Sequence, residues 1–271
     1  MIHLICALHC EAIPLLARYR LTQNTDPGLF RIYSNPDTGI TLTVSGPGKI
    51  NAAAATCYTH EYFHSPSSDA WLNIGTAGHL SLDIGTAVLV HQIHDMAANS
   101  TWYPQIVFPV SCASLALKTM DQPSGEYEEN LFDMEAAGFF SIASRISTCE
   151  LIHVLKVISD NKSVPAVKRP DKSAISSLIA NQTDVIDEII KSLQQLSCEL
   201  ATVNSTPADY FACLDRWHFT WSERRNLHNL LRRWEILYPD IPVLQHTGNI
   251  FCAQQFLRML EEQLNRTTIH Y

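Results

Sequence analysis

The chain has 271 residues, which is enough for one large domain or for a domain with an appendage. Hydrophobic residues make up 46% of it, so a sizeable core can form, whereas a net charge of −8 argues against a general nucleic-acid-binding protein. No apolar run approaches the ~20 residues that a membrane-spanning helix needs, and the N-terminus lacks the basic segment of a secretion signal. We therefore expect a cytoplasmic protein with no membrane segment and no nucleic-acid partner.

The eight cysteines are scattered and form no Cys-x-x-Cys pair, so we expect reduced thiols rather than a disulfide framework. Cys6, His9 and Cys10 lie close together, but their spacing matches no common zinc pattern. His91 and His94 lack an evident third ligand. The sequence therefore predicts no metal site and indicates no cofactor.

Short apolar segments alternate with helical patterns along the first 160 residues, which indicates an α/β domain. The predicted strands are residues 2–8, 29–33, 40–44, 70–74, 84–90, 115–120 and 151–158. The predicted helices follow Glu11, follow residue 51, span residues 133–146 and span residues 173–200. Residues 94–109 are expected to be irregular.

Beyond residue 200 the pattern is helical throughout, with a helix-start signal at Thr206 and Pro207 and another at Ser222. We therefore divide the chain into a domain of residues 1–200 and a C-terminal helical extension of residues 201–271. Residues 218–225 concentrate basic and aromatic side chains, which suits a contact surface for a nucleic acid or a partner protein. We favour a helix whose Trp and Leu residues pack while its arginines are solvated, because the chain is acidic overall.

Three carboxylates stand at junctions between predicted elements. Glu11 and Asp160 each follow a predicted strand, and open α/β sheets bind their ligands at that edge. Glu135 begins an apolar helix. Its negative charge is either stabilised there by the helix dipole or has a chemical role on a buried face. Carboxylates in different environments can divide the acid and base roles of glycoside cleavage.

Five stretches, in this order, resemble the nucleoside phosphorylase superfamily, and most closely its 5′-methylthioadenosine/S-adenosylhomocysteine nucleosidase branch. They are Ala7-Leu8-His9-Cys10-Glu11, Ser45-Gly46-Pro47-Gly48-Lys49-Ile50-Asn51-Ala52-Ala53, Asn73-Ile74-Gly75-Thr76-Ala77-Gly78, Asp133-Met134-Glu135-Ala136-Ala137 and Ile158-Ser159-Asp160. The resemblance covers about residues 1–200. It implies a mixed central β-sheet flanked by helices in three layers, and a homodimer.

The resemblance also implies roles for individual residues in the catabolism of purine nucleosides. Asp160 would protonate the purine at N7 as general acid, and Glu11 would activate the attacking water. Glu135 would hold the ribose hydroxyls, with Met134 packing against the sugar. The remaining residues expected to bind the substrate are Thr76, Ala77, Gly78, Lys156 and Ser159. Asp133 is expected to cap the helix outside the chemistry.

The nucleophile and the base are less closely specified. Asn73 stands near the position where related phosphorylases have a phosphate-binding Arg, which favours water and hence hydrolysis. Lys156 replaces an Arg of the nucleosidases, so phosphate as a ligand and phosphorolysis stay open as an alternative. Residues 94–130 lack a recognisable aromatic base-binding motif, with Met120 and Asp121 as candidates for the base pocket. A non-catalytic nucleoside- or partner-binding protein is the third reading.

Overall fold

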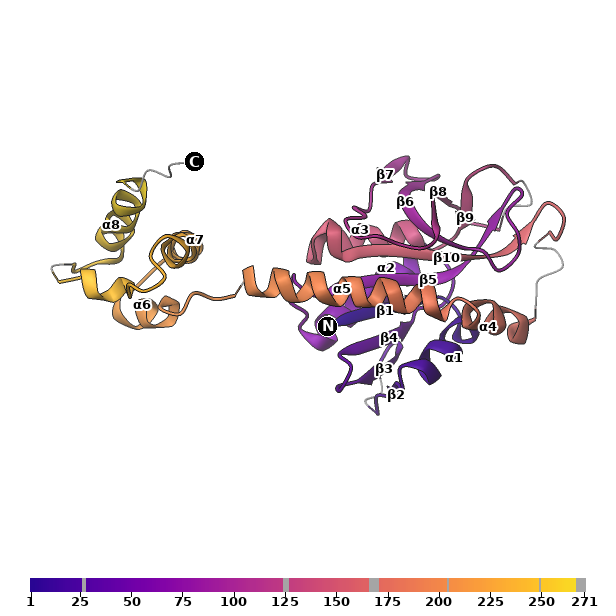
Figure 1. Ribbon diagram of the computed structural model, residues 1–271, viewed down its shortest axis with the longest axis horizontal. Coiled ribbons are helices and arrows are strands. Elements are labelled where there is room, and N and C mark those ends of the chain that lie inside the picture. Colours follow the sequence, from indigo (N-terminus) through magenta and orange to yellow (C-terminus); the bar gives the residue numbers. More distant parts are fainter. Residues whose placement is uncertain (26–27, 124–126, 166–170, 204, 249, 267–271) are drawn as a thin grey trace. The chain divides into compact units, whose positions relative to one another are not determined.

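The chain, seen here as a computed structural model, divides into two compact units, Met1–Thr202 and Val203–Tyr271, which we call unit 1 and unit 2 (Figure 1). The structure describes residues 1–25, 28–123, 127–165, 171–203, 205–248 and 250–266. Within these residues no helix is both long enough and apolar enough to cross a membrane.

Unit 1 is a mixed sheet with helices on both faces. Its strands are β1 (Ile2–Cys6), β2 (Thr22–Gln23), β3 (Arg31–Asn35), β4 (Ile40–Val44), β5 (Ala70–His79), β6 (Ala87–Asp95), β7 (Ser100–Trp102), β8 (Ala113–Thr119), β9 (Leu131–Asp133) and β10 (Ile152–Asn161). Its helices are α1 (His9–Arg18), α2 (Lys49–Phe63), α3 (Ala136–Ile146), α4 (Lys172–Ala180) and α5 (Thr183–Val203), the last ending at the boundary with unit 2.

The sheet follows the order β10-β6-β8-β9-β5-β1-β4-β3-β2, and β7 pairs with β6. Strands β1 and β5 pair in parallel, as do β5 and β10, whereas β10 and β6 are antiparallel. Because β10 pairs with both β5 and β6, the strands β5, β10, β6, β8 and β9 close into a ring of pairings. The prediction of a mixed central sheet is therefore confirmed.

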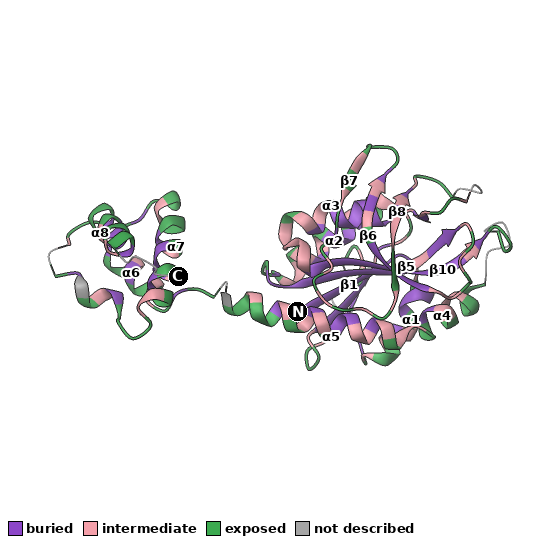
Figure 2. Cartoon of the chain, turned by 45° about the horizontal axis from the view of Figure 1, so that its top comes forward, coloured by how far each residue is buried: buried purple, intermediate pink, exposed green. Residues whose placement is uncertain are grey.

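Two apolar clusters make the sheet the middle of three layers. On one face, Leu15 of α1, Ile179 of α4 and Ile186 of α5 are fully buried in a cluster with side chains of β1, β4 and β5. On the other face, Ala52 of α2 and Phe139 of α3 are fully buried in a second cluster. Figure 2 shows the strands between these helices as buried. The predicted three-layer arrangement is confirmed.

Strand β5 is longer than the sequence predicts. The prediction ended this strand at Ile74, because small residues follow, but the strand continues to His79. Its parallel partner β10 pairs along the whole length, from Ile152 opposite Trp71 to Asn161 opposite His79. Continuous pairing of the backbone outweighs the weak strand preference of glycine.

Two further boundaries differ from the predictions. The strand expected at residues 84–90 is β6, which begins only at Ala87 and runs on to Asp95, because β8 pairs with it through Asp95. The region expected to be irregular holds β7, which pairs with the end of β6.

The two predicted long helices also differ. Asp133 ends β9 and α3 begins at Ala136, so Glu135 occupies the position before the first residue of α3, where its side chain makes no cap hydrogen bond. The helix expected over residues 173–200 is two helices, α4 and α5, separated by Asn181 and Gln182. The Asn181 N–H bonds to the Ser177 carbonyl and completes the end of α4.

Unit 2 has a small core of its own. Its helices are α6 (Tyr210–Arg216), α7 (Trp221–Leu237) and α8 (Ala253–Arg266), as the helical pattern predicts. Trp217 stacks on Phe256 with ring centroids 4.5 Å apart, and Trp234 is buried in the same cluster. Trp221 is 79% exposed, so only part of the expectation that the tryptophans pack is confirmed.

Helices α2 and α3 of unit 1 cross at a glycine. A Cβ added to Gly138 would lie 1.9 Å from the carbonyl oxygen of Lys49, a main-chain atom that cannot turn away. This close crossing brings the first turn of α2 to the start of α3, where Glu135 stands.

Replacing Gly138 with alanine should therefore separate the two helices. We expect Gly138→Ala to lower the free energy of unfolding by about 2–3 kcal/mol, in the upper range of overpacking substitutions. Denaturant unfolding followed by circular dichroism measures this loss. Ser144→Ala on the same helix is the control, and equal stability of the two variants would contradict the close packing.

Candidate active site

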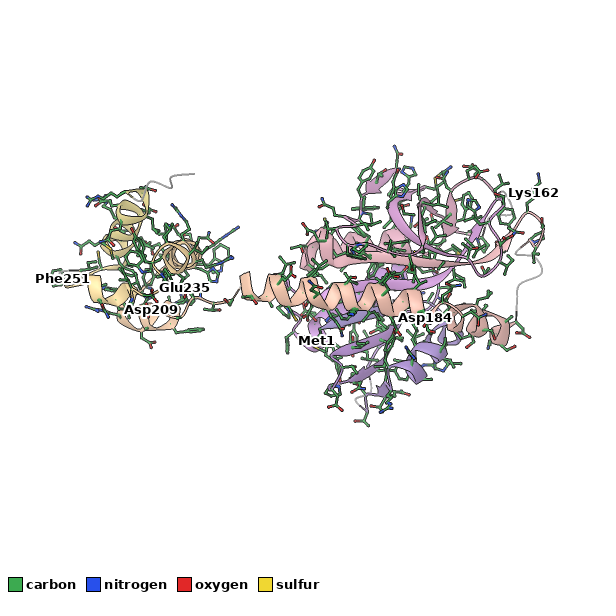
Figure 3. All side chains as sticks on the ribbon, in the orientation of Figure 1. Met1, Lys162, Asp184, Asp209, Glu235 and Phe251 are labelled. Carbon is green, nitrogen blue, oxygen red and sulfur yellow. The ribbon has the colours of Figure 1, made fainter. Side chains whose placement is uncertain are left out.

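A cavity of about 250 Å³ opens at the edge of the sheet where β5 and β10 end. Lys162, labelled in Figure 3, directly follows β10 and marks this end of the sheet. The polar lining includes four carboxylates and two hydroxyls, from Glu11, Asp133, Glu135, Asp160, Thr76 and Ser159. Pro47, Met120, Phe132, Met134 and Ile175 add apolar surface. Acidic and apolar side chains from segments far apart in the sequence thus line the same cavity.

Glu11 lies in the first turn of α1 and is 2% exposed. Its Oε1 accepts hydrogen bonds from the N–H and the hydroxyl of Thr76, at 2.9 and 3.0 Å, and its Oε2 accepts from the Leu8 N–H at 2.9 Å. Burial raises the pKa of Glu11, although these hydrogen bonds and Lys156 oppose the shift. Among the described residues Oε2 accepts one bond, so a lone pair is left for a water molecule.

Gly75 allows the sheet to approach this carboxylate. A Cβ at Gly75 would lie 3.2 Å from Oε1 of Glu11 and 3.5 Å from Nζ of Lys156. A side chain at this position would therefore press against the Glu11 carboxylate and touch the Lys156 ammonium. Gly75 therefore permits the close approach of two of the protein's own side chains.

Lys156 lies beneath the cavity and is 1% exposed. Its Nζ is 2.8 Å from Oδ2 of Asp133 and donates to Oδ1 of Asn73 at 2.8 Å. Burial disfavours the ammonium, but Asp133, Glu135 and Glu11 outweigh that effect, so the pKa of Lys156 is raised. Lys156 thus acts as the shared counter-ion of three carboxylates.

This position differs from the expectation that Lys156 binds substrate. The side chain is enclosed by Asp133 and Asn73 and does not line the cavity. Asp133 also differs from its expected role, because it does more than cap α3. It accepts from the Ala136 N–H at 2.8 Å, as a cap does, and it is also the partner of Lys156 at the cavity wall.

Glu135 faces the cavity from the start of α3. Its Oε1 accepts from the Gly48 N–H at 2.7 Å and its Oε2 from the Met134 N–H at 3.3 Å. Burial first, and Asp133 second, raise the pKa of Glu135. The Gly48 N–H, which the glycine-rich turn could have offered to a ligand anion, is therefore taken by a carboxylate of the protein.

Asp160 and Ser159 both line the cavity although they are consecutive residues of one strand. The pairing of β10 with β5 shifts register between Ile158 and Asp160, which places Asp160 opposite Gly78. Such an irregularity redirects side chains that would otherwise alternate between the two faces. The Ser159 hydroxyl donates to Oδ1 of Asp160 at 2.7 Å.

Tyr127 is a cavity residue that the sequence analysis did not identify. Its hydroxyl donates to Oδ2 of Asp160 at 2.8 Å, from a stretch that reads only as a surface loop. Phe132 was missed as well, and these two aromatic rings line a pocket for which the sequence offered no aromatic motif. No spacing identifies Tyr127, because its position depends on pairing between distant segments.

The structure brings the other expected site residues together. Glu11, Thr76, Ala77, Gly78, Met134, Glu135, Ser159 and Asp160 all line the cavity. Met120, a candidate for the base pocket, also lines it, whereas Asp121 pairs with Lys49 at 2.8 Å. Among the residues that the structure describes, no group of His, Cys, Asp and Glu side chains could hold a metal ion.

Removing the charge of Lys156 should leave the carboxylates above it uncompensated. We expect Lys156→Met to lower the free energy of unfolding by about 3–5 kcal/mol, as loss of one partner of a buried ion pair does. Thermal unfolding at neutral pH measures the loss. Lys191→Met, at an exposed position of α5, is the matched control. A Lys156→Met protein as stable as this control would contradict the role of counter-ion.

No protein-family model matches the chain, and no curated protein sequence matches it. Solved structures do resemble it. The apo 5′-methylthioadenosine nucleosidase of Arabidopsis thaliana is 16% identical, with a TM-score of 0.58 over 71% of this chain and 95% of that one. The 5′-methylthioadenosine/S-adenosylhomocysteine nucleosidase of Neisseria meningitidis, in complex with methylthio-immucillin-A, is 21% identical, with a TM-score of 0.54 over 70% and 98%.

A third similar structure is the nucleosidase of Colwellia psychrerythraea in complex with adenine, which is 17% identical with a TM-score of 0.56. It covers 72% of this chain and 95% of the nucleosidase. At these identities the likeness establishes the architecture. The chain has the fold of the 5′-methylthioadenosine/S-adenosylhomocysteine nucleosidases.

Proposed function

We propose that this protein hydrolyses the N-glycosidic bond of a purine nucleoside of the methylthioadenosine or S-adenosylhomocysteine type. The observation that carries the proposal is the convergence of Glu11, Glu135 and Asp160 on one cavity, each in a different environment. Cleavage through an oxocarbenium-like transition state needs an acid for the leaving group and anionic groups around the sugar. Fold likeness alone would not support this step.

Asp160 is the proposed general acid. It is partly exposed at the cavity wall, within reach of a bound base, and hydroxyl groups orient both of its oxygens. In its protonated form it would donate to N7 of the purine, so that the base leaves as a neutral molecule. The backbone of Gly78 lies against this carboxyl group and leaves room for it.

Glu11 is the proposed general base. Its raised pKa makes it a stronger base than an exposed glutamate, and Thr76 fixes its orientation through two hydrogen bonds. The remaining lone pair of Oε2 would accept a proton from water as that water attacks C1′ of the sugar.

Glu135 is the proposed ligand of the ribose hydroxyls. The Gly48 N–H donates to one carboxylate oxygen, and the other accepts one long hydrogen bond, from the Met134 N–H, among the described residues. The side chain of Met134 lines the cavity and would pack against the sugar. Ala77 and Gly78 supply a flat wall of backbone beside it.

The charge of the lining favours water over phosphate as nucleophile. Among the described residues no lysine or arginine lines the cavity, whereas four carboxylates do. The ammonium of Lys156 is already paired with Asp133 below the surface. A phosphate dianion would meet net negative charge there, which counts against phosphorolysis.

A non-catalytic nucleoside-binding protein is the competing class. Such a protein could use Glu135 to hold hydroxyl groups, but it would gain nothing from a buried base and a separately held acid. Formation of a homodimer and a cytoplasmic location remain predictions, as does an accessory role for residues 201–271.

Incubation of the purified protein with methylthioadenosine, S-adenosylhomocysteine, adenosine and inosine, with and without phosphate, tests the proposal. We expect free base from at least one adenine nucleoside without phosphate, and a fall in kcat of at least about 100-fold in Asp160→Asn. Asp184→Asn, at an exposed position labelled in Figure 3, is the control. Strict dependence on phosphate, or normal turnover by Asp160→Asn, would contradict the mechanism.

The pH dependence of kcat/KM tests the assignment of the base. Glu11 accepts a proton only when it is ionised, and burial raises its pKa above the ordinary 4.5. Activity should therefore fall on the acid side at a pH above that value. Glu11→Gln should remove most of the activity at every pH. An acid limb at or below pH 4.5 would argue for an exposed base instead.

A further inference from the structure

We propose that Tyr127 is the positioning residue of the general acid, holding Oδ2 of Asp160 through its phenolic hydroxyl until a purine base takes over that contact. This inference rests on the proposed function, because it assigns a partner to Asp160 in that reaction. The observation behind it is the 2.8 Å hydrogen bond from the Tyr127 hydroxyl to Asp160.

The two oxygens of Asp160 have separate donors. The Ser159 hydroxyl donates to Oδ1 at 2.7 Å, and the Tyr127 hydroxyl donates to Oδ2. Donors on both oxygens fix the rotation of a carboxyl group. Ser159 is the neighbour of Asp160 on the same strand. The hydrogen bond from Tyr127 is therefore the restraint that comes from another segment of the chain.

Gly78 leaves the space in which the side chains of Asp160 and Tyr127 meet. A Cβ at this position would lie 2.7 Å from Oδ2 of Asp160 and 3.1 Å from Cε1 of Tyr127. The carboxyl oxygen and the edge of the ring thus approach the same point of the β5 backbone. The pair is built into the cavity wall, which has room for it only because residue 78 is glycine.

The segment that carries Tyr127 is tied to its neighbours. The Leu80 N–H donates to the Glu128 carbonyl at 3.1 Å, and the Glu128 carboxylate pairs with Lys118 of β8. The ring of His79 is 3.1 Å from the Glu129 carbonyl. These contacts hold the residues directly after Tyr127 between the ends of β5 and β8.

The hydrogen bond has a chemical consequence for an acid. A purine that accepts the proton of Asp160 needs one of the carboxyl oxygens that hydroxyls now occupy, and only the Tyr127 hydroxyl belongs to another segment of the chain. While that hydroxyl donates, it fixes the orientation of the carboxyl group. When the carboxyl is protonated, the phenol can accept instead, because a phenolic oxygen also carries lone pairs. This contact ends when the base binds, because the carboxyl proton cannot be donated to the phenol and to N7 at the same time.

Few ionisable groups surround Asp160 among the residues that the structure describes. Besides Asp160 and Tyr127, these residues place Glu11, Asp133 and Glu135 at the cavity wall. Glu11 and Glu135 accept from backbone N–H groups, and Asp133 pairs with Lys156. The ring of His79, on the neighbouring strand, is held by Glu129 and by the Ser81 N–H. A change confined to the Tyr127 hydroxyl therefore acts on Asp160 first.

Tyr127→Phe isolates the hydroxyl, since it keeps the ring that lies over Gly78. We expect kcat to fall about tenfold while KM changes little, because the acid loses the restraint that holds it in position for proton transfer. Tyr19→Phe is the matched control. The Tyr19 hydroxyl donates to Asp187 at 2.6 Å, away from the cavity, so this variant removes the same kind of bond without touching Asp160.

A second measurement does not depend on turnover. Carboxyl ¹³C NMR of protein labelled at the aspartate side chains, with Asp160→Asn to assign the signal, reports directly on the surroundings of the Asp160 carboxyl group. Its chemical shift should change in Tyr127→Phe and stay in place in Tyr19→Phe. An unchanged chemical shift in Tyr127→Phe would overturn the inference. A changed chemical shift in a protein that releases no base would support the contact and refute the proposed function.

Discussion

The buried ion pair between Lys156 and Asp133 is the interaction on which the rest of the site depends. Two residues that are almost completely enclosed meet at 2.8 Å, and Asn73 satisfies another hydrogen of the ammonium. A lysine in that place is stable only because carboxylates surround it, and the carboxylates can crowd together only because the lysine is there. Glu11 and Glu135 owe their shared cavity to this central positive charge.

The fold explains how that charge comes to lie under the cavity. Parallel pairing of β10 with β5 places Lys156 opposite Gly75. Because Gly75 has no side chain, the carboxylate of Glu11 can also lie against this position. Farther along the same pair of strands, the irregularity at Ser159 turns Asp160 toward the cavity opposite Gly78. Thr76, which holds Glu11, and Lys156 and Asp160 are therefore spaced along one strand pair. The close crossing of α2 and α3 adds Glu135 to the same cavity.

Much of this could be predicted from local patterns, since apolar strands and acids at their ends show in the sequence. The α/β class and the choice of Glu11, Glu135 and Asp160 as candidate acids belong to that part, whereas the three layers were implied by the family resemblance. The length of β5 could not be predicted in this way, because backbone pairing with β10 outweighs the weak strand preference of its glycines. Lys156 stood as a lone lysine in an apolar strand, a signal that it needs a buried partner. Tyr127 gave no signal, because only contacts between distant segments determine its position.

Hydrolysis by a water held at Glu11 is the central claim, and isotope transfer tests it most directly. Methylthioadenosine would be incubated with the protein in ¹⁸O-labelled water containing phosphate, and the released sugar analysed by mass spectrometry. The account predicts one ¹⁸O atom at C1 of a free methylthioribose, and loss of that product in Glu11→Gln. A sugar 1-phosphate without the label, or an unchanged rate of sugar release by Glu11→Gln, would contradict it.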